Sequence, residues 1–381
     1  MSGFADSSGT PRGAGKIFAI NWSLVLLIGA TCSAGFLMLY SVAGGSLDPW
    51  ARAQMIRFGV GMAGMLVIAL IPIRFWHTVA PLAYGVALAL LVLVEIMGTI
   101  GMGAQRWIDL GFMQLQPSEL MKEALVMMLA AYYAWLDPLK VSRPLWMLPP
   151  LLLILVPMAL VLKQPNLGTA LVLLMVGGAV MFLAGVSLWY YAVAAAAGTG
   201  LVAAVLRSHG AEWQLLQDYQ YRRIFTFLDP SQDPLGAGYH ITQATIAMGS
   251  GGVSGRGFMQ GTQSRLNFLP ENHTDFIFTT LAEEFGFLGT MAMLGLFSLI
   301  VLLCMVSAIT NRDRFSALLT GGIAASLFVA FAINMGMVMG LMPVVGQPLP
   351  FVSYGGSSLL VLLAAFGLVQ SAHIHRPRRR D

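Results

Sequence analysis

The chain has 381 residues, of which 57% are hydrophobic and only 10% are charged, and its mean hydropathy is +0.76. These values exclude a soluble multidomain enzyme and indicate an integral membrane protein. Its formal net charge of +4 is better explained by basic residues in short cytoplasmic loops than by nucleic-acid binding, so no nucleic-acid partner is expected.

Several common chemistries are excluded by missing motifs. The sequence has no Walker A motif, no dinucleotide-binding glycine pattern and no HExxH pair, which excludes ATPases, dinucleotide enzymes and the common zinc peptidases. The two cysteines, Cys32 and Cys304, lie within apolar stretches and predict small buried side chains rather than a disulfide or a metal site.

Long apolar segments predict an all-α integral membrane protein, because a spanning helix needs about 20 mostly apolar residues. The first segment is too long for a secretory signal and lacks a cleavage site, so it is interpreted as a retained helix. The ten predicted spans, in chain order, are 18–43, 54–73, 78–99, 117–135, 145–163, 167–185, 188–206, 276–309, 316–342 and 356–371.

Three regions follow from this pattern. Residues 1–16 are Gly/Ser-rich and predict a disordered N-terminus, residues 17–371 form the membrane domain, and residues 372–381 form a basic tail. One large extracytoplasmic loop, residues 207–275, lies between the seventh and eighth helices. The distribution of Lys and Arg in the short loops places both termini in the cytoplasm.

The first polar cluster precedes and enters the fourth span. Arg106 and Gln116 come before it, and Ser118, Glu119 and Lys122 lie in its first turns. Glu119, Lys122 and Glu123 share one helix face, where charged groups are costly unless they are paired or face a wet cavity. A functional site is therefore favoured over an ion pair that only fixes helix packing.

The second cluster, Lys163–Thr169, is a tight turn between two spans. Pro165 and Gly168 suit an ordinary turn. On the residues alone, Lys163 is interpreted as a side chain that extends toward the membrane surface.

The third cluster is the long loop, and residues 207–286 hold eight of the 17 acidic residues. Its stretch Gly249–Gly257 is suited either to anion binding by backbone N–H groups or to a flexible hinge. Glu271, His273 and Asp275 lie at the mouth of the eighth span, and the single histidines indicate hydrogen bonding rather than metal ligation.

The fourth cluster, Gln347–Ser358, has two prolines and a glycine pair inside an apolar region, which predicts a broken helix. Irregular backbone at membrane depth is tolerated only where it is buried in protein or lines a cavity. All four clusters are expected on the outer face. A cavity there with an apolar floor and charged rim suits an amphiphile whose head group carries sugars or phosphates.

These motifs resemble those of the SEDS family of shape, elongation, division and sporulation proteins over essentially the whole chain. The sequence Gly261-Thr262-Gln263-Ser264 and the short polar N-terminus resemble the elongation branch more than the division branch. The motifs that carry the resemblance are Arg106-Trp107-Ile108, Gln116-Pro117-Ser118-Glu119 with Lys122, Gln164–Thr169, Asp233–Gly236, Gly261–Ser264, Leu269-Pro270-Glu271 with His273–Phe276, Glu283-Glu284 and Leu349–Ser357.

The resemblance implies a peptidoglycan glycosyltransferase that polymerises lipid II outside the bacterial cytoplasmic membrane, with a class B penicillin-binding protein as partner. It places the essential aspartate at Asp275, a candidate general base, and a charged cavity pair at Glu119 and Lys122. A divalent cation, Mg²⁺ or Mn²⁺, is a further expectation, with its ligands unknown. The substrate-binding candidates are Arg106, Gln116, Ser118, Glu119, Lys122, Lys163, Gln263, Glu271, His273, Ser353 and Ser357.

Three positions depart from the family pattern, and none of them is Asp275. Asn166 replaces a usual aspartate, Gln347 replaces an isoleucine, and Arg256 stands where lysine is frequent.

Two other classes of function remain open. A lipid II flippase or other transporter also has many spans with intramembrane charges, although its charges are expected near the bilayer midplane. A scaffold for the partner enzyme predicts that changes to the carboxylates are harmless.

Overall fold

The computed structural model describes residues 15–101, 104–109, 111, 114–210, 213–215, 218, 221, 225–227, 229, 237–265 and 271–376. Most of the predicted disordered N-terminus and residues 377–381 of the basic tail lie outside these ranges, as do the Asp233–Gly236 motif and Leu269-Pro270.

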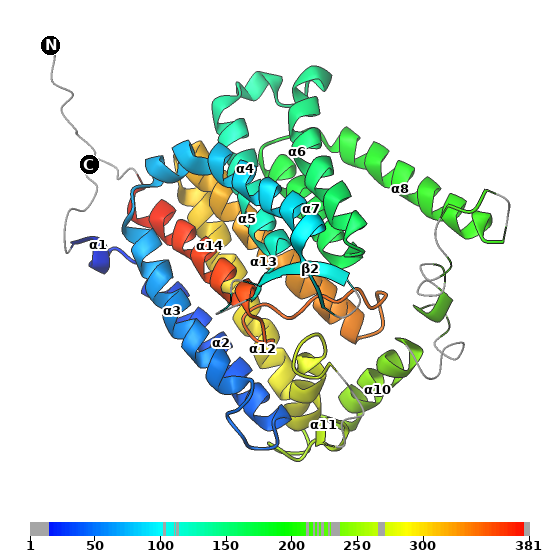
Figure 1. Ribbon diagram of the computed structural model, residues 1–381. Helices are drawn as coiled ribbons and strands as arrows, with labels where there is room; N and C mark the ends of the chain where they lie inside the picture. Colours follow the sequence, from blue (N-terminus) through cyan, green and yellow to red (C-terminus); the bar gives the residue numbers. More distant parts are fainter. Residues whose placement is uncertain are drawn as a thin grey trace, which may run out of the picture.

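The described residues form ten long helices, and each corresponds to one of the ten predicted spans (Figure 1). They are α2 (Trp22–Val42), α3 (Ala51–Leu70), α4 (Ile73–Met97), α5 (Pro117–Trp135), α6 (Pro144–Lys163), α7 (Leu167–Leu183), α8 (Leu188–Ser208), α12 (Ile277–Thr310), α13 (Arg314–Val338) and α14 (Ser357–Ile374). The shorter helices are α1 (Gly15–Phe18), the 3₁₀ helix η1 (Pro138–Lys140), α10 (Ala237–Ser250) and α11 (Thr262–Arg265).

The described helices differ in how well they meet the requirements for a membrane span. Eight are long and apolar enough to cross a membrane, whereas α7 has only 17 residues. Helix α5 has 19 residues but carries Glu119, Lys122 and Glu123 near its start. The polar residues of α5 are thus inside the bundle rather than toward lipid, since all three are buried.

The core is formed by helices whose surfaces are covered by protein. Helices α13 and α14 are mostly buried, and α5 packs against α4, α7 and α13. The outer helices expose large apolar side chains, as expected for surfaces that face lipid. Helix α8 is an extreme case, since it points away from the bundle in Figure 1 and only Ser208 of it is buried.

A small antiparallel sheet connects α4 to α5, in addition to the helices that the sequence predicts. Its strands are β1 (Thr99–Gly101), β2 (Ala104–Asp109) and β3 (Gln114–Leu115), in the order β1-β2-β3. Asp109 pairs with Gln114, which brings the chain back to the start of α5. The sheet therefore fixes where α5 begins.

The four polar clusters meet at one end of the bundle. Arg106 donates to the carbonyl of Gln164 at 3.0 Å, and Gln347 Nε2 donates to Thr169 Oγ1 at 3.1 Å. Ser353 Oγ donates to the carbonyl of Thr274 at 2.5 Å. This end of the bundle contains the candidate site.

Candidate functional site

The segment between α13 and α14, residues 339–356, has no regular structure and enters the bundle. Asn334 of α13, which is fully buried, holds it by donating from Nδ2 to the carbonyl of Gln347 at 2.7 Å. The same amide donates to the carbonyl of Asp275 at 2.9 Å. One side chain thus ties the segment to the turn that carries Asp275.

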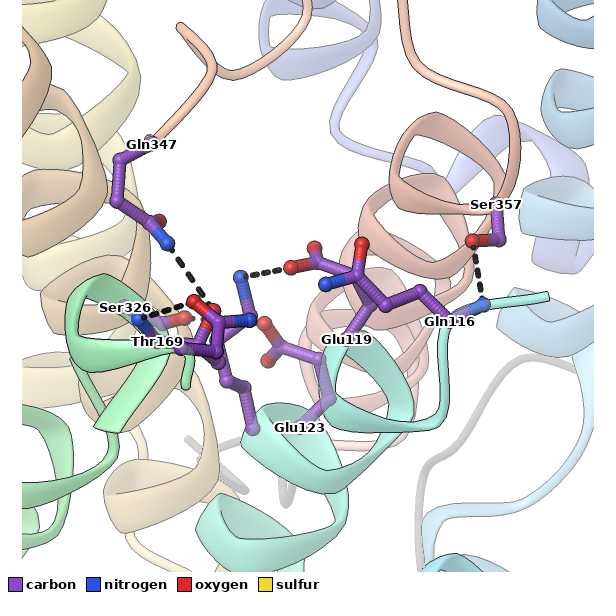
Figure 2. Close-up of polar contacts among 9 residues, drawn as sticks. Gln116, Glu119, Glu123, Thr169, Ser326, Gln347 and Ser357 are labelled. Carbon is purple, nitrogen blue, oxygen red and sulfur yellow. Dashed lines mark hydrogen bonds and ion pairs between the residues drawn. The ribbon is translucent and has the colours of Figure 1, made fainter. Parts of the chain in front are cut away.

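A polar cavity of about 40 Å³ lies between this segment and α5. Lys122 Nζ is 2.8 Å from Glu119 Oε1, and Ser326 of α13 donates to Glu123 Oε1 at 3.0 Å. Figure 2 shows Glu119 and Glu123 projecting from α5 toward Gln347 and Ser326. The predicted charged pair is therefore present and lines a cavity.

The cavity contains two carboxyl groups and one ammonium group. Glu119, Lys122 and Glu123 are each at least nine-tenths buried, and two carboxylates face one ammonium group. Glu123 Oε2 is buried and has no hydrogen-bond partner among the described residues. An unpartnered buried oxygen of this kind can take up a proton or bind a cation that accompanies a substrate.

The donors in the cavity are too few to form a complete metal site. The described residues contain no group of three His, Cys, Asp or Glu side chains arranged to hold a metal ion. Mg²⁺ is usually held by one or two carboxylates together with substrate phosphates. Glu123 and Glu119 fit that partial role.

Asp275 lies in the turn Glu271–Phe276, directly before α12. The turn is closed by a hydrogen bond of 3.1 Å from the N–H of Phe276 to the carbonyl of Glu271. No described group donates a hydrogen bond to the carboxylate of Asp275. Burial, and to a smaller extent the charge of Glu271, raise its pKa to about 6. Asp275 therefore has the acidity of a general base that operates near neutral pH.

Gly346 allows the irregular segment to approach this carboxylate. Its φ is +70°, and a Cβ there would lie 3.5 Å from Asp275 Oδ2. Thr274 Oγ1 donates to Glu271 Oε2 at 2.8 Å, which holds the Glu271 side chain on the same turn. Glu271 is thus a neighbour of Asp275 that stabilises the turn.

Aromatic groups enclose the turn from the side of α3. The rings of Trp50 and His273 stack at 4.5 Å, and the N–H of Tyr354 donates to the carbonyl of His273 at 2.9 Å. Burial lowers the pKa of His273, and the charge of Glu271 opposes that shift. His273 is therefore a neutral packing and hydrogen-bonding group beside Asp275.

Sequence reasoning missed Arg57 and Gln54. Gln54 Nε2 donates to the carbonyl of Ser353 at 3.0 Å, and the guanidinium of Arg57 lies 4.9 Å from the ring centre of Tyr354. Arg57 Nη1 is buried without a hydrogen-bond partner among the described residues. The sequence signal that could have found them is Arg57, a charged residue inside the apolar segment 54–73. It follows Gln54 by three residues, so both lie on one helix face.

Several predicted substrate-binding residues hold the structure together. Ser357 Oγ accepts from the N–H of Gln116 at 3.1 Å, and Ser118 is buried at the start of α5. Ser353 Oγ accepts from the N–H of Leu349 at 2.8 Å. These groups position the backbone around the cavity.

Three other predicted residues lie away from the cavity. Arg106 bonds to the carbonyls of Gln164 and Pro165. Lys163 Nζ is 3.7 Å from Glu95, and both side chains are exposed, in agreement with the snorkelling interpretation. The N–H of Gln263 donates to Glu283 Oε1 at 3.0 Å.

Asn166, one of the departures from the family pattern, caps a helix. Its Oδ1 accepts from the N–H of Thr169 at 3.3 Å at the start of α7. Asparagine and aspartate are about equally good in this position. The replacement therefore preserves the structural role of the turn.

Comparisons with known proteins agree with this geometry. The FtsW/RodA/SpoVE model, described as cell cycle protein, matches residues 18–378. The chain is 41% identical to the peptidoglycan glycosyltransferase MrdB of Escherichia coli strain K12 over 362 residues, covering 93% of each chain. It is 33% identical to stage V sporulation protein E of Bacillus subtilis, covering 91% of this chain and 94% of that one.

Solved structures show the same fold. A chain of a peptidoglycan synthase complex that coordinates polymerization and crosslinking is 34% identical, with a TM-score of 0.79, covering 93% of this chain and 97% of that one. The rod shape determining protein RodA of Thermus thermophilus is 30% identical, with a TM-score of 0.70, covering 94% and 98%. The chain therefore belongs to the FtsW/RodA/SpoVE family, the SEDS family that its motifs predicted.

Proposed function

We infer that the chain is a peptidoglycan glycosyltransferase that polymerises lipid II into glycan strands for cell elongation. The observation that carries this inference is Asp275, a carboxylate at the mouth of α12 with a pKa raised to about 6 and no hydrogen-bond donor among the described residues. Asn334 joins the carbonyl of Asp275 to that of Gln347, and Gln347 lines the cavity that contains the Lys122 ammonium group.

The proposed reaction inverts the anomeric carbon of the lipid-linked donor. Asp275 takes the proton of the acceptor sugar hydroxyl while its oxygen forms the new bond to that carbon. The bond from the carbon to the diphosphate oxygen breaks, and the diphosphate leaves with the electron pair. Positive charge near the leaving group lowers the barrier, which is the role assigned to Lys122 and Arg57.

The role of Lys122 is supported by its surroundings. The ammonium group is 2.8 Å from Glu119 Oε1 and is buried on α5 next to the irregular segment. Glu119 positions Lys122. We propose that Glu123, whose Oε2 has no described partner, would help to hold a divalent cation, which would supply positive charge to the diphosphate.

The partner and the orientation are also part of the proposal. A class B penicillin-binding protein supplies transpeptidation, as supported by the similarity to a synthase complex that coordinates polymerization and crosslinking. The four polar clusters face the outside of the cytoplasmic membrane, both termini are cytoplasmic, and Asp275 meets lipid II at the outer boundary.

A transport assay distinguishes polymerisation from flipping. Purified protein with its partner is placed in liposomes with fluorescent lipid II, and both glycan length and movement of the label across the bilayer are measured. The proposal expects long glycan strands whose formation does not depend on transfer across the bilayer. Label movement without any polymer contradicts the proposal and favours the transporter.

A further inference from the structure

Helix α12 is broken at Gly286, where the backbone has φ 63° and ψ −157°. Essentially only glycine adopts this conformation. In a continuous helix, the N–H groups of Phe287 and Leu288 donate to the carbonyls of Glu283 and Glu284. The break separates these two donors from these two acceptors.

The glycine-rich stretch Gly251–Gly257, here called the wedge, supplies partners for all four groups. The N–H groups of Arg256 and Gly257 donate to the carbonyls of Glu283 and Glu284, each at 3.0 Å. The N–H groups of Phe287 and Leu288 donate to the carbonyls of Gly252 and Val253 at 2.9 and 3.1 Å. The wedge thus replaces both lost helical hydrogen bonds with four new ones.

The fit of the wedge depends on glycine at the contact. A Cβ at Gly251 would lie 2.1 Å from the carbonyl oxygen of Ala282, and one at Gly255 would lie 2.1 Å from that of Glu284. A Cβ at Gly286 would lie 2.3 Å from the nitrogen of Gly255. Backbone atoms cannot yield as a flexible side chain can, so these positions exclude larger residues.

Side chains secure the wedge at its far end. Glu283 Oε1 accepts from Thr262 Oγ1 at 3.1 Å, and Arg256 Nη1 donates to the same hydroxyl at 2.9 Å. Ser41 of α2 donates to the neighbouring Glu284. Both carboxylates are buried, so their hydrogen bonds fix the break against the loop and against α2.

We propose that the wedge positions Asp275 and couples it to the large extracytoplasmic loop. The short first part of α12, Ile277–Phe285, follows Asp275 almost directly, and its other end is tied to the wedge through the backbone carbonyls of Glu283 and Glu284. A movement of the loop therefore changes the place of the general base without touching the substrate. Gly255, Thr262 and Glu283 are positioning residues. This inference rests on the proposed function.

Hydrogen exchange and kinetics together test the proposal on the full chain with its partner. Gly255→Ala is compared with Gly249→Ala, which sits in open space at the end of α10. Exchange at Phe287 and Leu288 is expected to rise by about tenfold or more in Gly255→Ala, because local opening exposes these amides. The value of kcat for lipid II polymerisation falls by about tenfold or more while KM stays constant, because misplaced groups slow the chemical step.

A milder pair of variants covers the case in which Gly255→Ala does not fold. Thr262→Val removes the hydroxyl between Arg256 and Glu283 and is expected to lower kcat in the same way, whereas Thr262→Ser restores it. Faster exchange with unchanged kcat overturns the coupling, and unchanged exchange in Gly255→Ala overturns the wedge. Absence of polymer in the parent protein contradicts the proposed function, whereas the exchange measurement still tests the wedge.

Discussion

At the scale of single residues, the ionisation of Asp275 links stability to activity. Its pKa is raised from 3.8 to about 6, mainly by burial, so the folded protein holds this proton more tightly than the unfolded chain. Stability is therefore lost as pH rises from about 4 to about 6 and then stays constant. The folded state tolerates a destabilising charge at the residue that we propose as the general base.

The first prediction concerns the pH dependence of the rate. Because only the ionised carboxylate accepts a proton, kcat/KM for lipid II falls about tenfold per pH unit below an apparent pKa of about 6. Polymerisation rates between pH 4.5 and 8 test this. A profile that is flat through pH 6, with the protein still folded, contradicts the assignment of Asp275 as the base.

The second prediction concerns the loss of folding stability that the ionised Asp275 carboxylate causes. Asp275→Asn is expected to stabilise the protein at pH 7.5 by about 3 kcal/mol, since the pKa rises from 3.8 to about 6 and one pKa unit corresponds to about 1.4 kcal/mol. The gain should shrink toward pH 4, where the parent carboxyl is protonated. Thermal unfolding in detergent at both pH values measures it, and a lower midpoint for the variant at pH 7.5 refutes it.

The third prediction separates the two roles of Lys122. Lys122→Met leaves Glu119 buried without its partner, which typically costs about 3–5 kcal/mol. The double variant Glu119→Gln with Lys122→Met is expected to regain folding but stay inactive, because the positive charge near the diphosphate is absent. Polymerisation at the parent level by the double variant would show that the pair is only structural.

The fourth prediction concerns Arg57. Arg57→Gln is expected to lower kcat/KM for lipid II, because the positive charge assigned to the diphosphate and its buried, unpartnered Nη1 are lost. The matched control is Arg52→Gln on the same helix, whose guanidinium is exposed and 3.8 Å from Asp48. An equal effect of both substitutions argues against a binding role for Arg57.

At the scale of elements, hydropathy predicted the ten long helices of the described residues, because each coincides with a long and mostly apolar segment. Eight of them also meet the length and apolarity needed to cross a bilayer, whereas α7 is short and α5 carries charges. The sheet was missed because β1 and β3 have only three and two residues, too few for an alternating pattern. The break at Gly286 was missed because apolar residues continue on both sides of it. Sequence patterns report burial, whereas these two features depend on backbone partners from distant segments.

Only part of the candidate site could be predicted from the sequence. The resemblance to the family motifs gave Asp275, and the charges of Glu119 and Lys122 are also conspicuous in an apolar helix. They did not reveal that Asn334 joins the Asp275 turn to Gln347, since a single amide within a span has no distinctive pattern. Contacts of this kind become visible only when the helices are packed.

At the scale of the whole molecule, all four polar clusters lie at one end of the bundle, and the orientation of that end is the fifth prediction. A cysteine at Val253, which is exposed on the loop side, should react with an impermeant reagent added outside the cell. A cysteine at Leu139, exposed at the other end, should be protected. Cys32 and Cys304 are buried and are replaced first. The reverse labelling pattern overturns the proposed orientation.

The most direct test of the central claim is the length of the glycan strands formed from lipid II by the purified protein with its class B penicillin-binding partner. The parent is expected to form long strands, and well-folded Asp275→Asn is expected to lose about 10²–10⁴-fold in rate, the usual contribution of a general base. Polymerisation by Asp275→Asn at the parent rate would contradict the account.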